Sequence, residues 1–182
     1  MIPAVAGLST GLGLSLAILS LITWIPVPPP ESAMQLSEQL RATNQFSLAI
    51  AMLLVGPVAE EMFFRGLVFR AWHQRYGFAI ALVGSASLFA ILHLLSWQVL
   101  VALPLGLLLG WIVLKTGSVM PAILGHFGAN IAPRLMDPIL AIAGYSDSQI
   151  EAMVRAPIWI TCLGFILLVA GIAVTSNYNR SR

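Results

Sequence analysis

Residues 76–114 read YGFAIALVGSASLFAILHLLSWQVLVALPLGLLLGWIVL and contain no formally charged side chain. A helix that crosses a bilayer needs about 20 predominantly apolar residues, so this stretch is long enough for two such helices. The polar triplet Ser96-Trp97-Gln98 interrupts it near the middle. The stretch therefore predicts two consecutive transmembrane helices joined by a short turn.

The overall composition supports a membrane protein. The 182 residues are 59% hydrophobic and only 9% charged, whereas soluble domains are about 45–50% apolar and about 25% charged. This composition excludes disordered, collagen-like and disulfide-stabilised folds, and a net charge of +2 is too small to indicate nucleic-acid binding. The sequence predicts an all-α, polytopic helix bundle in a single domain, residues 1–182, with membrane lipid as its surroundings.

Four further apolar segments bring the expected number of spans to six. The short fifth span begins at Pro121 and is expected to end at Pro133-Arg134, because proline breaks helices. Polar stretches at 31–41 and 134–155 are expected to form loops, the first of them alternatively a short interfacial helix. The four segments are Ile2–Trp24, which ends before the prolines of 26–30, residues 46–70, residues 119–132 and residues 158–174.

The distribution of Lys and Arg predicts the orientation. With six spans, five basic residues lie on the side of the two termini and three on the opposite side. Cytoplasmic loops carry the excess of Lys and Arg, so we expect a multi-pass protein of the cell membrane with cytoplasmic termini. The five residues are Arg70, Arg75, Lys115, Arg180 and Arg182, and the three are Arg41, Arg134 and Arg155.

Ionisable residues inside spans are costly and usually functional, and the first such cluster is Glu60-Glu61-Met62-Phe63-Phe64-Arg65. Glu61 and Arg65 are four residues apart, so on a helix they can form an ion pair. Glu60 points about 100° away from Glu61 and lacks that partner. Gly56-Pro57, just upstream, is expected to loosen the helix and free a carbonyl near Leu53.

Two further clusters place polar side chains in other spans. In one, Phe89 and His93 are four residues apart; in the other, His126 and Asn130 have the same spacing, which puts each pair on one helical face. Gly125 and Gly128 would allow a neighbouring helix to approach closely. Together the three clusters contain one unpaired carboxylate, two imidazoles and an amide. These groups can supply the base, the group that orients it and the hydrogen-bond donors of a catalytic site.

Each cluster also has a structural interpretation. The Glu61–Arg65 pair can simply hold helices together, His93 can be a buried histidine bonded to a backbone carbonyl, and Asn130 can link helices. The combination in three spans favours a catalytic site over these separate packing roles.

The three motifs in this order resemble the CPBP family of intramembrane endopeptidases, which includes the CAAX prenyl-protein endopeptidases and the bacterial Abi-type proteins. The resemblance covers about residues 46–133. It implies that Glu60 activates water with the help of His93, and that His126 and Asn130 stabilise the oxyanion. Glu61 and Arg65 would support the site and contact substrate.

The resemblance implies a membrane-associated protein or peptide as substrate. The chain is short, so elements that bind prenylated substrates in larger relatives are expected to be missing, which leaves prenylation of the substrate open. Counting helical rise from Arg70 and Gly77 places Glu60 and His93 inside the bilayer, in a cavity expected to open to the cytoplasm.

The residues leave a metal site open. Glu60, His93 and His126 match the ligand set of a catalytic zinc ion, but they come from three spans and the chain has no His-Glu-x-x-His helix. Using Glu60 as a ligand would also remove the obvious base. We therefore expect glutamate catalysis without a cofactor, with zinc as the alternative.

Two non-proteolytic functions remain. A membrane scaffold or bacteriocin-immunity protein would keep the motifs for packing, and a small transporter would use Glu and His as a proton relay. The relay gives no reason for Asn130 beside His126, and the chain lacks the matching halves of many transporters. The sequence favours the enzyme.

Overall fold

All the regular structure in the described part of the chain is helical. The computed structural model describes residues 1–25, 47, 50–93, 96–146, 149 and 155–178, with the side chains of 96 and 97 excepted. The predicted all-α bundle is confirmed. Its elements are α1 (Ile2–Ile22), η1 (Ala51–Val55), α4 (Gly56–Glu61), η2 (Met62–Val68), α5 (Phe69–Tyr76), α6 (Phe78–Leu92), α7 (Ser96–Thr116), α8 (Met120–Ile142) and α10 (Ile158–Ser176).

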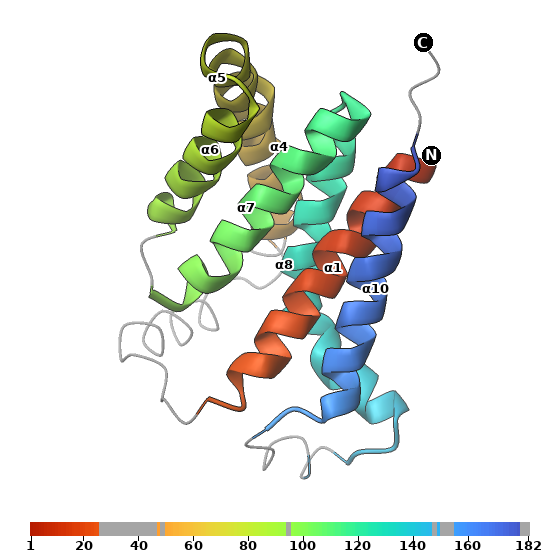
Figure 1. Ribbon diagram of the computed structural model, residues 1–182. Helices are drawn as coiled ribbons and strands as arrows, with labels where there is room; N and C mark the ends of the chain where they lie inside the picture. Colours follow the sequence, from red (N-terminus) through yellow and green to blue (C-terminus); the bar gives the residue numbers. More distant parts are fainter. Residues whose placement is uncertain (26–46, 48–49, 94–95, 147–148, 150–154, 179–182) are drawn as a thin grey trace.

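The helices run side by side, and the start of α1 and the end of α10 lie at the same end of the bundle as α5 (Figure 1). At that end the guanidinium of Arg70 donates a 3.3 Å hydrogen bond to the carbonyl of Gly117, in the turn between α7 and α8. Gly117 has a φ of +68° and Gly77, between α5 and α6, has a φ of +82°. Both turns therefore use a backbone conformation that glycine adopts without steric cost.

Helix α1 packs between α8 and α10 with its backbone close to both. A Cβ added to Gly11 would lie 2.9 Å from the Cα of Gly125 and nearer still to its carbonyl. A Cβ added to Gly128 would lie 2.6 Å from the carbonyl oxygen of Leu8, and one added to Gly164 would lie 2.6 Å from the nitrogen of Ala17. The close approach predicted at Gly125 and Gly128 is confirmed, and its partner is α1. Small residues let helices pack in lipid, where no hydrophobic effect drives them together.

The segment from η1 to α5 is one continuous helical path with two wide turns. The N–H of Gly56 donates to the carbonyl of Ala51, five residues back, and the N–H of Phe69 donates to that of Phe64. This i to i+5 register is the π-helix, which often occurs at functional sites. In this register the carbonyl of Met52 would accept from residue 57, but Pro57 has no N–H. The freed carbonyl is therefore that of Met52, one residue from the predicted Leu53.

The predicted end of the fifth span at Pro133-Arg134 is wrong. Helix α8 continues through Pro133 and Pro138 to Ile142, so the first part of the stretch expected to be a loop is helical. Each proline removes one backbone hydrogen bond, but neighbouring helices can compensate for that loss in a membrane protein.

The remaining boundaries agree closely with the sequence. Helix α6 ends at Leu92 and α7 begins at Ser96, so the division falls where predicted, although the Ser96-Trp97-Gln98 triplet starts a helix. Three described helices (Ile2–Ile22, Gln98–Thr116 and Ile158–Ser176) are long and apolar enough to cross a membrane. The count of six spans remains a prediction, and the prolines of 26–30 and the polar stretch 31–41 lie outside the described residues.

Candidate active site

The predicted ion pair between Glu61 and Arg65 is present and fully buried. Its atoms Oε1 and Nη1 are 3.0 Å apart, and both side chains are 0% exposed. Arg65 also donates from Nη2 to the carbonyl oxygen of Gly106 in α7, at 3.2 Å. A Cβ at Gly106 would lie 3.2 Å from that nitrogen, so the glycine leaves room for the guanidinium.

His126 joins the two glutamates. Its Nδ1 lies 2.9 Å from Oε1 of Glu61, and its Nε2 lies 3.9 Å from Oε2 of Glu60. An ionised carboxylate only accepts hydrogen bonds, so the contact with Glu61 assigns a proton to Nδ1. The second nitrogen then faces Glu60, and the imidazole orientation is fixed by a carboxylate that itself is paired with Arg65.

Aromatic rings cover the buried charges. The guanidinium carbon of Arg65 lies 4.5 Å from the ring centroid of Phe89, which is an attractive cation–π distance. The same ring contacts His126 edge to face, with centroids 5.5 Å apart, and His93 at 4.6 Å. Phe89 therefore touches three polar side chains of the site, a role that its motif position alone did not reveal.

Glu60 differs from Glu61 in exposure and in partners. Its side chain is 38% exposed and lines a cavity of about 1090 Å³. Its atom Oε2 is buried and has no hydrogen-bond partner in the described part of the chain. The sequence prediction that one carboxylate is neutralised and the other is available is confirmed in its geometry.

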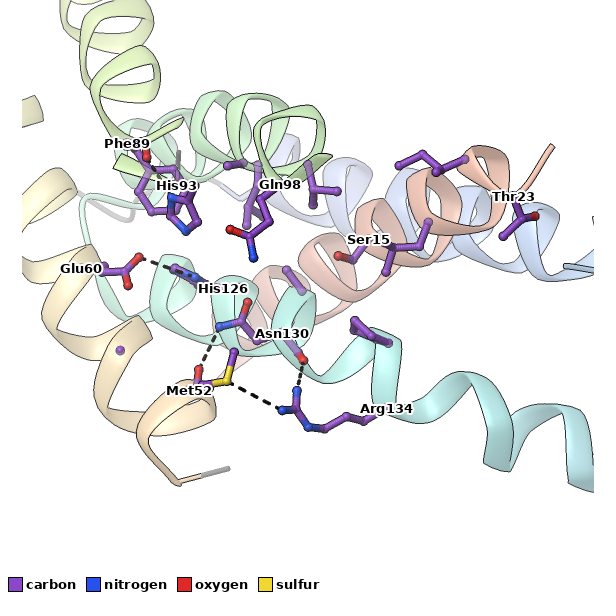
Figure 2. Close-up of a pocket in the computed structure, with 18 of the residues that line it drawn as sticks. Ser15, Thr23, Met52, Glu60, Phe89, His93, Gln98, His126, Asn130 and Arg134 are labelled. Carbon is purple, nitrogen blue, oxygen red and sulfur yellow. Dashed lines mark hydrogen bonds and ion pairs between the residues drawn. The ribbon is translucent and has the colours of Figure 1, made fainter. Parts of the chain in front are cut away.

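The other three predicted catalytic side chains line the same cavity. Figure 2 shows Glu60 from α4, His93 from the end of α6, and His126 and Asn130 from α8 converging on one space. Glu61 and Arg65 do not line it, since both are fully buried. The pair lies behind the cavity next to His126, so a supporting role agrees with its position, and neither side chain faces the space where a substrate would bind.

His93 follows directly after α6 and approaches the cavity from the side opposite Asn130 (Figure 2). Its Nδ1 lies 2.9 Å from the carbonyl oxygen of Phe89. A carbonyl oxygen only accepts, so Nδ1 carries the proton and Nε2 of the neutral ring is left as an acceptor. Among the described residues, no hydrogen bond or ion pair joins His93 to Glu60, whose nearest such partner is His126.

Asn130 donates a hydrogen bond to the backbone carbonyl that Pro57 leaves without a donor. Its Nδ2 donates a 2.9 Å hydrogen bond to the carbonyl of Met52, the group left free by the π-helical register. The amide is thereby held between α8 and η1, with its oxygen and second N–H still available. The sequence signal was Pro57 itself, but only the π register shows which carbonyl it frees.

The cavity extends away from the chain termini. Its lining includes Thr23, Trp24 and Ile25 after α1, Gln98 in the first turn of α7, and Arg155 ahead of α10, all at the opposite end of the bundle from the termini (Figure 1). A separate buried apolar cluster of α5 to α8 includes Phe69, Leu109, Ile112 and Val113.

The orientation of the chain in the membrane stays a prediction. Cytoplasmic termini and a cavity that opens to the cytoplasm are both expected from the sequence, and the lining residues show only along which helices the cavity extends.

The positions of the three candidate zinc ligands bear on the zinc alternative, and catalysis without a metal stays a prediction. Among the described residues, no group of three or more His, Cys, Asp or Glu side chains is arranged to hold a metal ion. Within the proposed ligand set, Glu60 and His126 are neighbours, whereas Nδ1 of His93 is engaged with its own helix.

Comparisons with known proteins bear on the same region. No curated protein and no solved structure matches the chain. A family model described as type II CAAX prenyl endopeptidase Rce1-like matches residues 42–132, half of the sequence and the part that carries all three motifs. This chain belongs to that Rce1-like family of CAAX prenyl endopeptidases.

Proposed function

We propose that this protein is an intramembrane endopeptidase in which Glu60 activates the attacking water. One observation carries the proposal: Glu60 lines a cavity together with His93, His126 and Asn130, while the adjacent Glu61 is sealed behind it in an ion pair. Family membership supports endopeptidase activity on membrane-associated proteins. The residue roles are our inference from the geometry.

Glu60 is the group suited to remove a proton from water. Its carboxylate group is partly exposed in the cavity and can accept a hydrogen bond from water, and its buried atom Oε2 receives none in the described structure. Nε2 of His93 is an acceptor facing the same space and orients the water through its second hydrogen. The hydroxide adds to the scissile carbonyl carbon, and the proton held by Glu60 then passes to the departing amine as the carbon–nitrogen bond breaks.

His126 and Asn130 are suited to bind the oxyanion. With Nδ1 donating to Glu61, a proton on Nε2 makes His126 a cation, and the group of Glu60, Glu61, Arg65 and His126 then has no net charge. That Nε2–H and the free N–H of Asn130 are donors that need no rearrangement, which is most effective where water is excluded. Glu61 and Arg65 act by positioning His126.

This mechanism requires no metal, because the carboxylate itself takes the proton. Zinc held by Glu60, His93 and His126 would occupy the base, and Glu61 could not replace it while paired with Arg65. We also propose a prenylated, membrane-anchored protein or peptide as substrate, on the strength of the family description, and the cell membrane as location.

The test is cleavage of a library of free and S-prenylated CAAX peptides by the purified chain, with products read by mass spectrometry. Glu60→Gln should lower kcat by about 10²–10⁴-fold, the range typical of general-base catalysis. The matched control is Asp137→Asn, which removes an exposed carboxylate outside the cavity and should leave kcat within about twofold.

Two results would contradict the proposal. Full activity in a folded Glu60→Gln protein would favour the scaffold or immunity interpretation, since packing needs no ionised carboxylate there. Loss of wild-type activity with a zinc chelator, restored by added zinc, would replace glutamate catalysis by a metal site.

A further inference from the structure

The cavity has a cationic outer part that the proposed chemistry does not use. Arg134 is exposed, lies on α8 and lines the cavity. His126, Asn130 and Arg134 follow one another at intervals of four residues, so they form a row along one helical face. The row starts at the carboxylates and ends at a guanidinium (Figure 2).

Arg134 has no carboxylate partner in the described structure, where every ion pair involves Arg65 or His126. Its Nη1 donates to the backbone carbonyl of Asn130 at 3.1 Å, and its Nη2 lies 4.0 Å from the sulfur of Met52. A thioether is a weak acceptor. The guanidinium is therefore held against the cavity wall while most of its five donors remain available.

A second cation lines the cavity. Arg155 also lines it, with its guanidinium carbon 5.3 Å from the ring centroid of Trp24. The chain is pinned there by two hydrogen bonds, from the indole of Trp24 to the carbonyl of Ala156 and from the N–H of Ala156 to the hydroxyl of Thr23. These bonds hold the backbone next to Arg155 against the residues that follow α1.

We propose that Arg134 binds a carboxylate of the substrate peptide and so selects which bond is cut. This inference rests on the proposed function, because it assumes that the scissile carbonyl lies against His126 and Asn130. Arg134 is four residues beyond Asn130, about 6 Å along the helix. An extended peptide covers about 3.3 Å per residue, so with the reach of the side chain the carboxylate lies about two to three residues past the cleaved bond.

A free C-terminal carboxylate meets this requirement best. It is planar and matches the fork of a guanidinium, which favours two parallel hydrogen bonds. The same charge and shape on a lipid phosphate is the competing source, and the experiment below separates the two.

The test measures binding in the non-cleaving Glu60→Gln background, so it does not depend on catalysis. The probe is a dansyl-labelled, S-prenylated CAAX peptide, made once with a free C-terminal carboxylate and once as the amide. In neutral detergent, Kd for the acid should be at least about tenfold lower than for the amide, as expected for hydrogen bonds to a charged group. Adding Arg134→Gln should reduce this preference to about twofold or less.

Two further variants sharpen the result. Arg134→Lys keeps the positive charge but loses the planar, two-pronged guanidinium, so it should retain an intermediate preference for the acid over the amide peptide. It replaces Arg134→Gln as the test variant if that protein does not fold. Arg75→Gln removes an exposed arginine at the opposite end of the bundle and should leave the preference unchanged.

Three outcomes would overturn the inference. The preference for the acid over the amide peptide could be undiminished in Arg134→Gln, or absent in the Glu60→Gln parent. It could also require added phosphatidylglycerol, which would assign Arg134 to a lipid phosphate. Failure of the wild type to cleave would count against the proposed function alone, because the binding preference is measured without cleavage.

Discussion

Two regions of this protein are built on opposite principles. Where α1 meets α8 and α10, the contacts are between backbones and small residues, with a 2.7 Å hydrogen bond between the hydroxyls of Ser20 and Thr161. Between η1 and α6, the helix is widened at two places and carries the buried pair Glu61–Arg65. The contacts of the first region join regular helices without charged side chains. The second region has π-helical turns and buries several charged side chains.

The difference shows how a small membrane protein can place charged groups in an apolar bundle. Close packing of α1 on α8 fixes the helix that bears His126 and Asn130. The wide turns of the other region then bring Glu61 and the Met52 carbonyl against that fixed helix. A uniformly regular region 51–76 would not leave the Met52 carbonyl free for Asn130.

The largest expected effect comes from removing the buried cation. Arg65→Met leaves Glu61 as a charge without its guanidinium in an apolar interior, so stability should fall by about 3–5 kcal/mol. Thermal and denaturant unfolding in detergent would measure the loss, with Arg75→Met as the exposed control. Adding Glu61→Gln should recover part of the stability, and a double variant no more stable than Arg65→Met would contradict the desolvation argument.

The next effect tests the close-packed region. Gly11→Ala adds a Cβ that overlaps the backbone of α8 at Gly125, so the helices must separate, at a cost of about 1–3 kcal/mol. Gly66→Ala in η2 is the matched change in the other region, because its Cβ would meet nothing closer than 3.9 Å. It should be neutral or stabilising by up to about 1 kcal/mol. Equal effects of the two substitutions on the unfolding midpoint would refute the contrast.

The smallest effect tests the bond between the two regions. Asn130→Ala removes the donor to the Met52 carbonyl and should cost about 1 kcal/mol. In a Pro57→Ala background, residue 57 gains an N–H that can bond to that carbonyl, so the same substitution should cost at least about 0.5 kcal/mol less. A double-mutant cycle of unfolding free energies measures this coupling, and an identical cost in both backgrounds would show that the π register is not the reason for the contact.

Much of the site could be predicted because its residues follow a helical period. The four-residue spacing of Glu61 and Arg65 was sufficient to pair them, and that of His126 and Asn130 was sufficient to put them on one face. The link between His126 and Glu61 was not predictable, since it joins residues 65 positions apart. The end of α8 was predicted too early. In soluble proteins a proline usually ends a helix, but in a membrane bundle neighbouring helices can satisfy the backbone groups that the proline leaves unpaired.

By itself, the sequence determined that this chain is a helical membrane protein, where most of its apolar helices lie, and which glutamate is paired within its own helix. These features follow from composition and from contacts along a single helix, which local geometry fixes. Only the tertiary structure decided that four polar side chains share one cavity, that Asn130 bonds to the Met52 carbonyl, and that the cavity extends away from the termini. These three features depend on how separate helices pack. The packing is set by the glycine contacts of α1 and by the wide turns on either side of Glu60, and both bring together residues that are far apart in the sequence.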